Sequence, residues 1–213
     1  MIGLTTGALA LLLAGAGVSP CAGPVRTHLH VQWSTPATMV APDRSWVVEV
    51  HPLLDAASNQ TPIMLRRCDD SQQWPLFTLE RSADLHWSAD SKQLLIVDQP
   101  LSGTNKLLLL SIPAIATGRS DSSVDALDRM VTVSLKERLG TGALMQFYLP
   151  AVVSWTDSTL LLAVGGETYV GTGGELGRFC YGVRVRTDTL HLDDVLSEAE
   201  LRTRSGHGCQ VSP

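Results

Sequence analysis

The chain lacks the short motifs that identify common enzyme classes. It contains no Gly-x-Ser-x-Gly elbow, no His-Glu-x-x-His metal motif, no Ser-x-x-Lys pair and no dinucleotide-binding glycine fingerprint. The sequence therefore predicts no cofactor and favours a role without catalysis. A hydrolase stays open as the alternative, because the carboxylates of glycosidase-like enzymes have no local sequence signature.

Positive charge is also scarce. The 16 lysines and arginines are outnumbered by 21 aspartates and glutamates, which gives a formal net charge of −5. The adjacent pair Arg66 and Arg67 is followed closely by Asp69 and Asp70. Binding to a phosphate backbone needs a clustered basic surface, so nucleic acid is not an expected partner.

The four cysteines, Cys21, Cys68, Cys180 and Cys209, form no Cys-x-x-Cys pair. This spacing gives no support to a zinc knuckle or a thioredoxin-type motif, and disulfides are the natural interpretation in an oxidising compartment. We favour a bridge between Cys180 and Cys209, which would pin the polar C-terminal tail to a strand. Four cysteines allow three pairings, and all three stay open at this point.

The first charged residue is Arg26, and residues 1–18 are apolar. A run this short, followed by small residues and a polar chain, is typical of an export signal rather than a spanning helix. Residues 1–23 are therefore interpreted as a signal peptide and short leader. We expect an exported protein, periplasmic or secreted, with no stable transmembrane segment after processing. A lipid anchor at Cys21 is the less favoured alternative, because Pro20 precedes it.

Residues 83–113 contain the clearest structural pattern. A strand-like stretch ends at Trp87, and a polar turn separates it from an apolar run that reaches Val97. A loop and a second apolar run, residues 107–112, follow. Short apolar runs bounded by turn residues predict successive antiparallel strands. The sequence thus predicts one mostly β domain over residues 24–213, with one or two short helices.

The same pattern recurs along the chain. Asp90 has a counterpart 47 residues earlier at Asp43, within Ala-Pro-Asp-Arg-Ser, and a later one at Asp157, two residues after Trp155. The stretch Trp-Ser-Ala-Asp-Ser-Lys-Gln-Leu that begins at Trp87 resembles the repeat turn of TolB-like (WD40-like) β-propellers. Such a turn uses its aspartate to hold a tight reversal between strands.

This resemblance implies propeller-blade-like units near residues 38–70, 83–113 and 150–188, with an insertion at 114–144. It also implies protein binding through loops at one end of the blades. Three units are fewer than ring closure normally takes, so we expect self-association or docking on a partner protein to cover the open edges. A β-sandwich is the alternative fold.

The sequence also predicts the local structure of three further segments. Residues 124–135 suggest a short helix running into a strand, and residues 192–201 show the i, i+3, i+4 spacing of an amphipathic helix. The glycine-rich stretch 165–177 is expected to be a loop between strands that presents Glu167 and Tyr169 as contact residues.

Histidines supply the remaining candidates. His28 and His30 alternate on a predicted strand, so both imidazoles lie on one side, which is compatible with metal binding. For a metal site, no carboxylate or third histidine lies at a useful local spacing. His86, beside Trp87, is a candidate general base, but the sequence identifies no nucleophile or partner for it. Neither a metal site nor a catalytic site is predicted, and an exposed polar strand face is the favoured interpretation.

Overall fold

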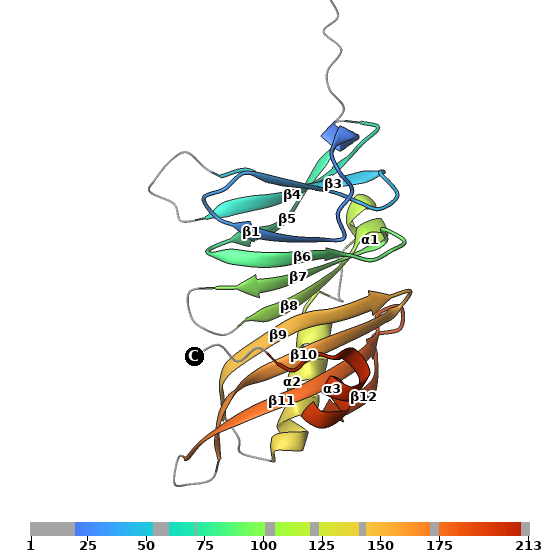
Figure 1. The fold of residues 1–213 in the computed structure, drawn as a ribbon. Helices are drawn as coiled ribbons and strands as arrows, with labels where there is room; N and C mark the ends of the chain where they lie inside the picture. Colours follow the sequence, from blue (N-terminus) through green and yellow to red (C-terminus); the bar gives the residue numbers. More distant parts are fainter. Residues whose placement is uncertain are drawn as a thin grey trace, which may run out of the picture.

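The computed structural model describes residues 20–52, 60–70, 72–100, 105–119, 124–140, 144–170 and 175–209. Within these residues the protein is mostly β, as expected, with three antiparallel sheets of four strands each. No closed propeller forms among the described strands, which stack as three layers (Figure 1). The apolar segment interpreted as an export signal lies almost wholly outside the described residues.

Apart from β1, the strands of the three sheets follow one another along the chain. Sheet A contains β2 (Ala37–Val40), β3 (Trp46–Val50), β4 (Thr61–Arg67) and β5 (Gln73–Leu79). Sheet B contains β1 (His28–Gln32), β6 (Ser82–Trp87), β7 (Gln93–Gln99) and β8 (Lys106–Ser111). Sheet C contains β9 (Leu144–Thr156), β10 (Thr159–Val170), β11 (Glu175–Arg186) and β12 (His191–Ser197). The helical segments are η1 (Pro20–Ala22), α1 (Ile112–Ala116), α2 (Ala126–Leu139) and α3 (Glu198–Ser205).

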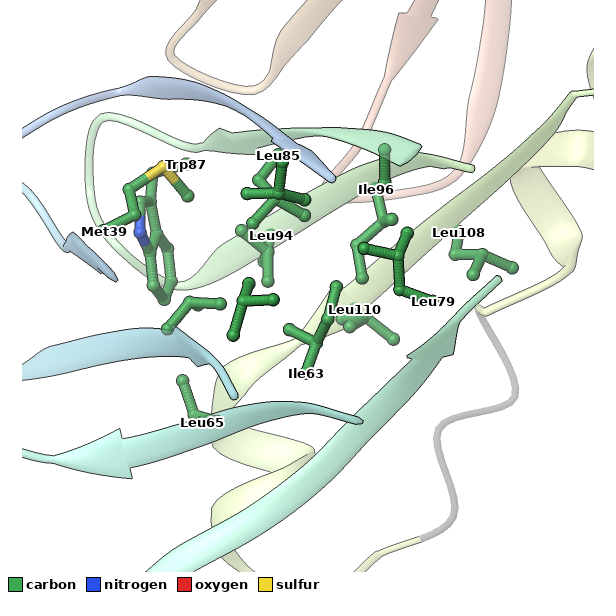
Figure 2. Close-up of a cluster of buried hydrophobic side chains, with 14 of the residues drawn as sticks. Met39, Ile63, Leu65, Leu79, Leu85, Trp87, Leu94, Ile96, Leu108 and Leu110 are labelled. Carbon is green, nitrogen blue, oxygen red and sulfur yellow. The ribbon is translucent and has the colours of Figure 1, made fainter. Parts of the chain in front are cut away.

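Sheet B is the middle layer, and its strands β7 and β8 are covered on both faces. Because successive side chains of a strand point to opposite faces, Leu94 and Ile96 pack against sheet A while Leu95 and Val97 pack against sheet C and α2. Figure 2 shows the first of these interfaces, where side chains of sheets A and B meet. Burial on both sides explains why β7 and β8 are continuous apolar runs.

Strand β1 connects the first two layers. It precedes sheet A in the chain but pairs with β6 of sheet B, with His28 opposite His86 and His30 opposite Asp84. All four strands of sheet A therefore lie in the chain between β1 and β6, which are neighbours in sheet B. This pairing joins residues fifty or more positions apart.

The turns at Asp43 and Asp90 share one geometry. The Ala41 amide donates to the carbonyl of Trp46 at 2.9 Å, and the Ser88 amide donates to the carbonyl of Gln93 at 3.0 Å. In each turn the aspartate Oδ1 accepts the backbone N–H two residues later, at 2.9 Å for Asp43 and 3.1 Å for Asp90. Arg44 and Ser91 take matching positive φ angles of 61° and 59°. The two turns also touch, because Asp43 N–H donates to Ser91 Oγ at 3.0 Å.

The third copy has a different turn. Thr156 and Thr159 are paired across β9 and β10, so only Asp157 and Ser158 remain to form the reversal. Asp157 itself takes the positive φ, 50°. The chain therefore reverses over two residues here, where five residues separate the strands at Asp43 and at Asp90.

The helix expectations need correction, because three α-helices rather than one or two form in the described residues. Residues 126–139 form one continuous helix, α2, with no strand following from it before residue 140. Residues 191–197 form strand β12, and the helix begins only at Glu198, where Ser197 and Glu200 make a capping box. The helical spacing was misleading because an irregularity beside Asp193 puts Leu192 and Val195 opposite Val185 and Val183, on the same face.

The glycine-rich stretch is largely strand rather than loop. Glu167 and Tyr169 lie in β10, opposite Arg178 and Leu176 of β11, and only residues 171–174 between the strands lie outside the description. Gly166 is needed for packing, since a Cβ there would collide with the backbone oxygen of Phe147 and the ring of Phe179. Close approach, and not a flexible loop, explains this glycine.

Two disulfides fasten the chain ends onto the outer layers. Cys21 bonds to Cys68 and packs with Val40 and Val47 on the outer face of sheet A. Cys180 bonds to Cys209, the favoured pairing, beside α3. The buried Leu201 of α3 lies over Gly182 on the outer face of sheet C. Each end of the stack is thus partly covered by the protein's own terminal segment, and both bridges indicate an oxidising compartment.

Several sheet edges are also protected. Pro75 lies in edge strand β5 and Pro150 in edge strand β9, and proline cannot donate to a further strand. Along the edge of β8, Leu107 N–H donates to Asp128 Oδ1 at 3.0 Å and Leu109 N–H donates to the carbonyl of Val124 at 3.3 Å. These features reduce the tendency of the edges to pair with another chain.

Candidate functional site: a histidine cleft between sheets B and C

Sheets B and C separate on the side of β1 and β6, and a cleft of about 490 Å³ opens between them. We call it the histidine cleft. It is lined from sheet B and its turns by Thr27, His28, Asp84, His86, Trp87, Ala89 and Val97, and from β9 by Ala151, Val152, Val153, Ser154 and Trp155. The cleft thus has a polar floor on one side and a mostly apolar wall with Trp155 on the other.

The floor follows from the strand alternation of the sequence. On the side of sheet B that faces sheet C, the two strands β7 and β8 present leucine and valine, which pack against sheet C. The neighbouring strands β1 and β6 present His28, His30, Asp84 and His86 at two adjacent cross-strand pairs. One face of the same sheet therefore changes from apolar to polar, and the cleft lies over the polar half.

Asp84 is the centre of the polar contacts. Its Oδ1 lies 2.9 Å from His30 Nδ1 and 3.5 Å from His28 Nε2. Its Oδ2 accepts a hydrogen bond from Gln99 Nε2 at 2.9 Å. An aspartate bound on both oxygens is held in one orientation, and it fixes the ring of His30 in turn.

His86 is the most enclosed of the histidines in this cluster. Its ring stacks on that of His28, with centroids 4.4 Å apart and planes inclined by 20°. Burial, and to a smaller extent the neighbouring His28, lower the pKa of His86 to about 4, while Asp84 opposes the shift. At neutral pH His86 is therefore an uncharged imidazole, with one ring nitrogen that can accept a hydrogen bond.

The site is rich in nitrogen and oxygen acceptors beside an aromatic wall. Such a combination can orient a small polar ligand, with the imidazoles and the carboxylate giving direction and Trp155 giving apolar contact. Among the residues that the structure describes, no three His, Cys, Asp or Glu side chains are arranged to hold a metal ion.

The residues singled out from the sequence are distributed over the molecule. Trp87 and Trp155 line the cleft, while Asp90 and Asp157 lie together at a second hollow of about 540 Å³ at the turn end of the sheets. Glu167 and Tyr169 lie toward the other end of β10 and line neither hollow. The structure thus places four of the five repeat-turn residues at these two hollows and Asp43 against Ser91, and it leaves the expected contact residues elsewhere.

Asp84 is the residue that sequence reasoning missed. It lies 54 positions from His30 and 56 from His28, so local spacing gives no sign of it. The signal available was the alternation of polar and apolar residues in β6, which puts Asp84 and His86 on one face. Polar residues on the same face of a strand indicate either solvent exposure or a site, and here they form the floor of a cleft.

Comparison with known proteins supplies no relative. No protein-family model, curated protein or solved structure matches this chain. The site must therefore be interpreted from its own geometry. None of the helices in the described part of the chain is long and apolar enough to cross a membrane.

Proposed function

We propose that this is an exported accessory protein of the cell envelope that binds a small ligand in the histidine cleft. The observation that supports this function is the convergence of His28, Asp84 and His86 on one side of a cleft whose other side carries Trp155. Pockets that join a few directed polar groups to an aromatic wall are typical of ligand sites. The two disulfides support the exported location, periplasmic or secreted.

The blade-like repeat supports a framework role for the sheets. The matching turns at Asp43 and Asp90 are consistent with a relationship to TolB-like repeats, which we retain as a proposal. In this arrangement the repeats build the stack, and the cleft arises where two stacked sheets diverge. Binding then depends on the sheet faces rather than on loops at one end.

Filling the cleft is expected to abolish binding. Thr27 is exposed and lines the cleft, so Thr27→Trp places an indole in the cavity while leaving the strands intact. The purified protein is incubated with the small-molecule fraction of the cells that produce it and examined by native mass spectrometry. Wild type is expected to show at least one adduct that Thr27→Trp reduces at least tenfold.

Thr35→Trp is the matched control, because Thr35 is exposed in the turn after β1 and does not line the cleft. It is expected to retain the adduct. Identical spectra for the three proteins, whether with or without adducts, contradict ligand binding in this cleft.

A second candidate function is protein binding at the far end of sheet C. Phe147, Tyr169 and Leu176 are 38%, 38% and 52% exposed, which is unusual for large apolar side chains. Glu167 and Arg178 lie among them with their charged groups 3.5 Å apart. Exposed aromatic residues beside a charged pair are typical of interaction surfaces.

A photo-crosslinking residue tests this surface in the producing cells. Substitution of Tyr169 by benzoyl-phenylalanine is expected to give a discrete crosslinked product on illumination. The same residue at Thr203, on the exposed side of α3, is the control and is expected to give none. Absence of a discrete product at Tyr169, or the same product at both sites, rules out this surface.

A further inference from the structure

We propose that β1 binds a short free peptide, which adds to sheet B as a fifth strand and places alternate side chains in two hollows. This inference rests on the proposed function, because one of the hollows is the histidine cleft, and it names the class of the ligand. Extended peptides bind exposed sheet edges in this way, where backbone hydrogen bonds give affinity and side-chain pockets give specificity.

Strand β1 is the outermost strand of sheet B, and its outer side is open within the described part of the chain. It pairs with β6 alone. It contains no proline, lysine or carboxylate of the kind that protects other edges. No described side chain or loop bonds to the backbone of His28 or His30 from the outer side, in contrast to the covered edge of β8. An edge of this kind pairs readily with another strand.

The hydrogen-bond register shows which backbone groups point outward. The Trp87 amide donates to the carbonyl of Thr27 at 2.9 Å, so Thr27 directs its backbone groups toward β6. This direction alternates from one residue to the next along an antiparallel strand. His28, His30 and Gln32 therefore direct their N–H groups away from β6, where an added strand can accept them.

A hollow lies beside each end of this strand. The histidine cleft includes His28, and a second hollow of about 400 Å³, which we call the Trp33 hollow, lies at the other end. Trp33 is 41% exposed, so its ring is available for contact. Peptide residues opposite His28 and Gln32 are four positions apart, or about 13 Å along the strand. The Trp33 hollow is lined by His30, Gln32, Trp33, Arg81, Ser82 and Gln99.

Asp84 joins the cleft and the Trp33 hollow into one polar surface. Its Oδ1 lies 3.5 Å from Nε2 of His28, which lines the cleft, and 2.9 Å from Nδ1 of His30, which lines the Trp33 hollow. Its Oδ2 accepts a hydrogen bond from Gln99 of the same hollow at 2.9 Å. Because residues directly opposite on antiparallel strands share a face, alternate side chains of the added peptide lie beside this surface.

Charge specifies one end of the peptide. Arg81 is exposed and forms no ion pair with any described residue, whereas Arg67 is paired with Asp69. A guanidinium group binds a carboxylate through two parallel hydrogen bonds, so the Trp33 hollow favours an acidic side chain. The apolar wall with Trp155 favours an apolar side chain in the cleft. With antiparallel pairing, the acidic residue comes four positions before the apolar one.

The probe is a phage-displayed library of random seven-residue peptides, selected against the protein with both disulfides intact. An enriched peptide is synthesised, and its binding is measured by fluorescence anisotropy. His30→Pro is expected to bind it at least tenfold more weakly than wild type, because proline removes an outward N–H and leaves the bonds to β6 in place. His30→Ala is the matched control, since it loses the same imidazole but keeps the N–H, and it is expected to bind within about twofold of wild type.

Two further variants make the test independent of one substitution. If circular dichroism shows that His30→Pro does not fold, Gln32→Pro takes its place with Gln32→Ala as control, because the Gln32 N–H also points outward. Arg81→Ala is expected to remove the preference for an acidic residue among the selected peptides. An unchanged preference contradicts the assignment of the acidic side chain to the Trp33 hollow.

Three outcomes overturn the peptide assignment. They are the absence of any enriched peptide, equal binding by the proline and alanine variants, and a wild-type dimer that the proline variant converts to a monomer in light scattering. In the last case a second copy of the chain occupies the edge. Tandem mass spectrometry of the adduct from the small-molecule fraction is expected to show peptide fragments. If the adduct that Thr27→Trp removes is not a peptide, only this inference fails and the proposed function stands.

Discussion

Replacing Cys21 and Cys68 by serine is expected to lower the free energy of unfolding by about 4 kcal/mol. The bridge closes a loop with a sequence separation of 47 residues, and the chain-entropy relation gives about this value for such a loop. It also holds the segment that covers Val40 and Val47, so its loss exposes the outer face of sheet A. Urea unfolding at pH 7.5 measures the change, and binding of a hydrophobic dye reports the exposed face.

The Cys180 and Cys209 pair provides the comparison. Its separation of 29 residues predicts a slightly smaller loss, about 3.5 kcal/mol, when both are replaced by serine. If either double variant unfolds at the same urea concentration as wild type, the corresponding terminal segment does not stabilise the stack. An unchanged dye signal in the Cys21 and Cys68 variant means that the outer face of sheet A is covered by something else.

Asp98→Asn is expected to stabilise the protein by about 2 kcal/mol at pH 7.5. Asp98 is 6% exposed in β7, and its Oδ1 has no hydrogen-bond partner in the described part of the protein. Burial raises the pKa of Asp98 to about 6, while nearby Lys106 opposes the shift and Glu80 adds to it. The neutral amide avoids the cost of a buried carboxylate, and the value allows for partial screening by solvent.

The gain depends on pH with a definite sign. The pKa of Asp98 is higher in the folded than in the unfolded state, so the folded state binds more protons. The contribution of protonated Asp98 to the free energy of unfolding is therefore complete below about pH 4. It is lost as the pH rises through about 6. The difference between Asp98→Asn and wild type is therefore expected to be small at pH 4 and to grow up to about pH 7.

Urea unfolding of both proteins across this pH range measures the difference directly. Asp193→Asn is the control, because Asp193 is exposed in β12, and its difference from wild type is expected to stay within about 0.5 kcal/mol. A gain for Asp98→Asn that is the same at pH 4 and pH 7.5 contradicts a buried carboxylate with a raised pKa.

The layered fold is visible in part in the sequence. The apolar runs of β7 and β8 predict strands because they are short, branched and bounded by turns, and the turn residues Asp43 and Asp90 mark equivalent reversals. The pairing of β1 with β6 could not be predicted, because it depends on where sheet A places the returning chain. The irregularity beside Asp193 likewise puts Leu192 and Val195 on one face of a strand. Their spacing in the sequence therefore predicted a helix where the structure has a strand.

The histidine cleft, like the fold, combines residues that are close in the sequence with residues that only the fold brings together. His28 and His30 are recognisable as a pair on one strand face, and the sequence argues against a metal because no carboxylate or third histidine lies at a useful local spacing. The fold brings Asp84 and His86 of β6 beside this pair, but no three of the described side chains are placed to hold a metal ion. The cleft itself depends on the divergence of two stacked sheets, which no single strand encodes.

The most direct test of the histidine cleft uses nuclear magnetic resonance of protein labelled with ¹⁵N at its six histidines. Spectra are recorded before and after addition of the small-molecule fraction. We expect the ring signals of His28 and His86, which line the cleft, to shift while those of His51, His191 and His207 stay in place. Unchanged signals from His28 and His86, or shifts confined to His51, His191 and His207, contradict the account.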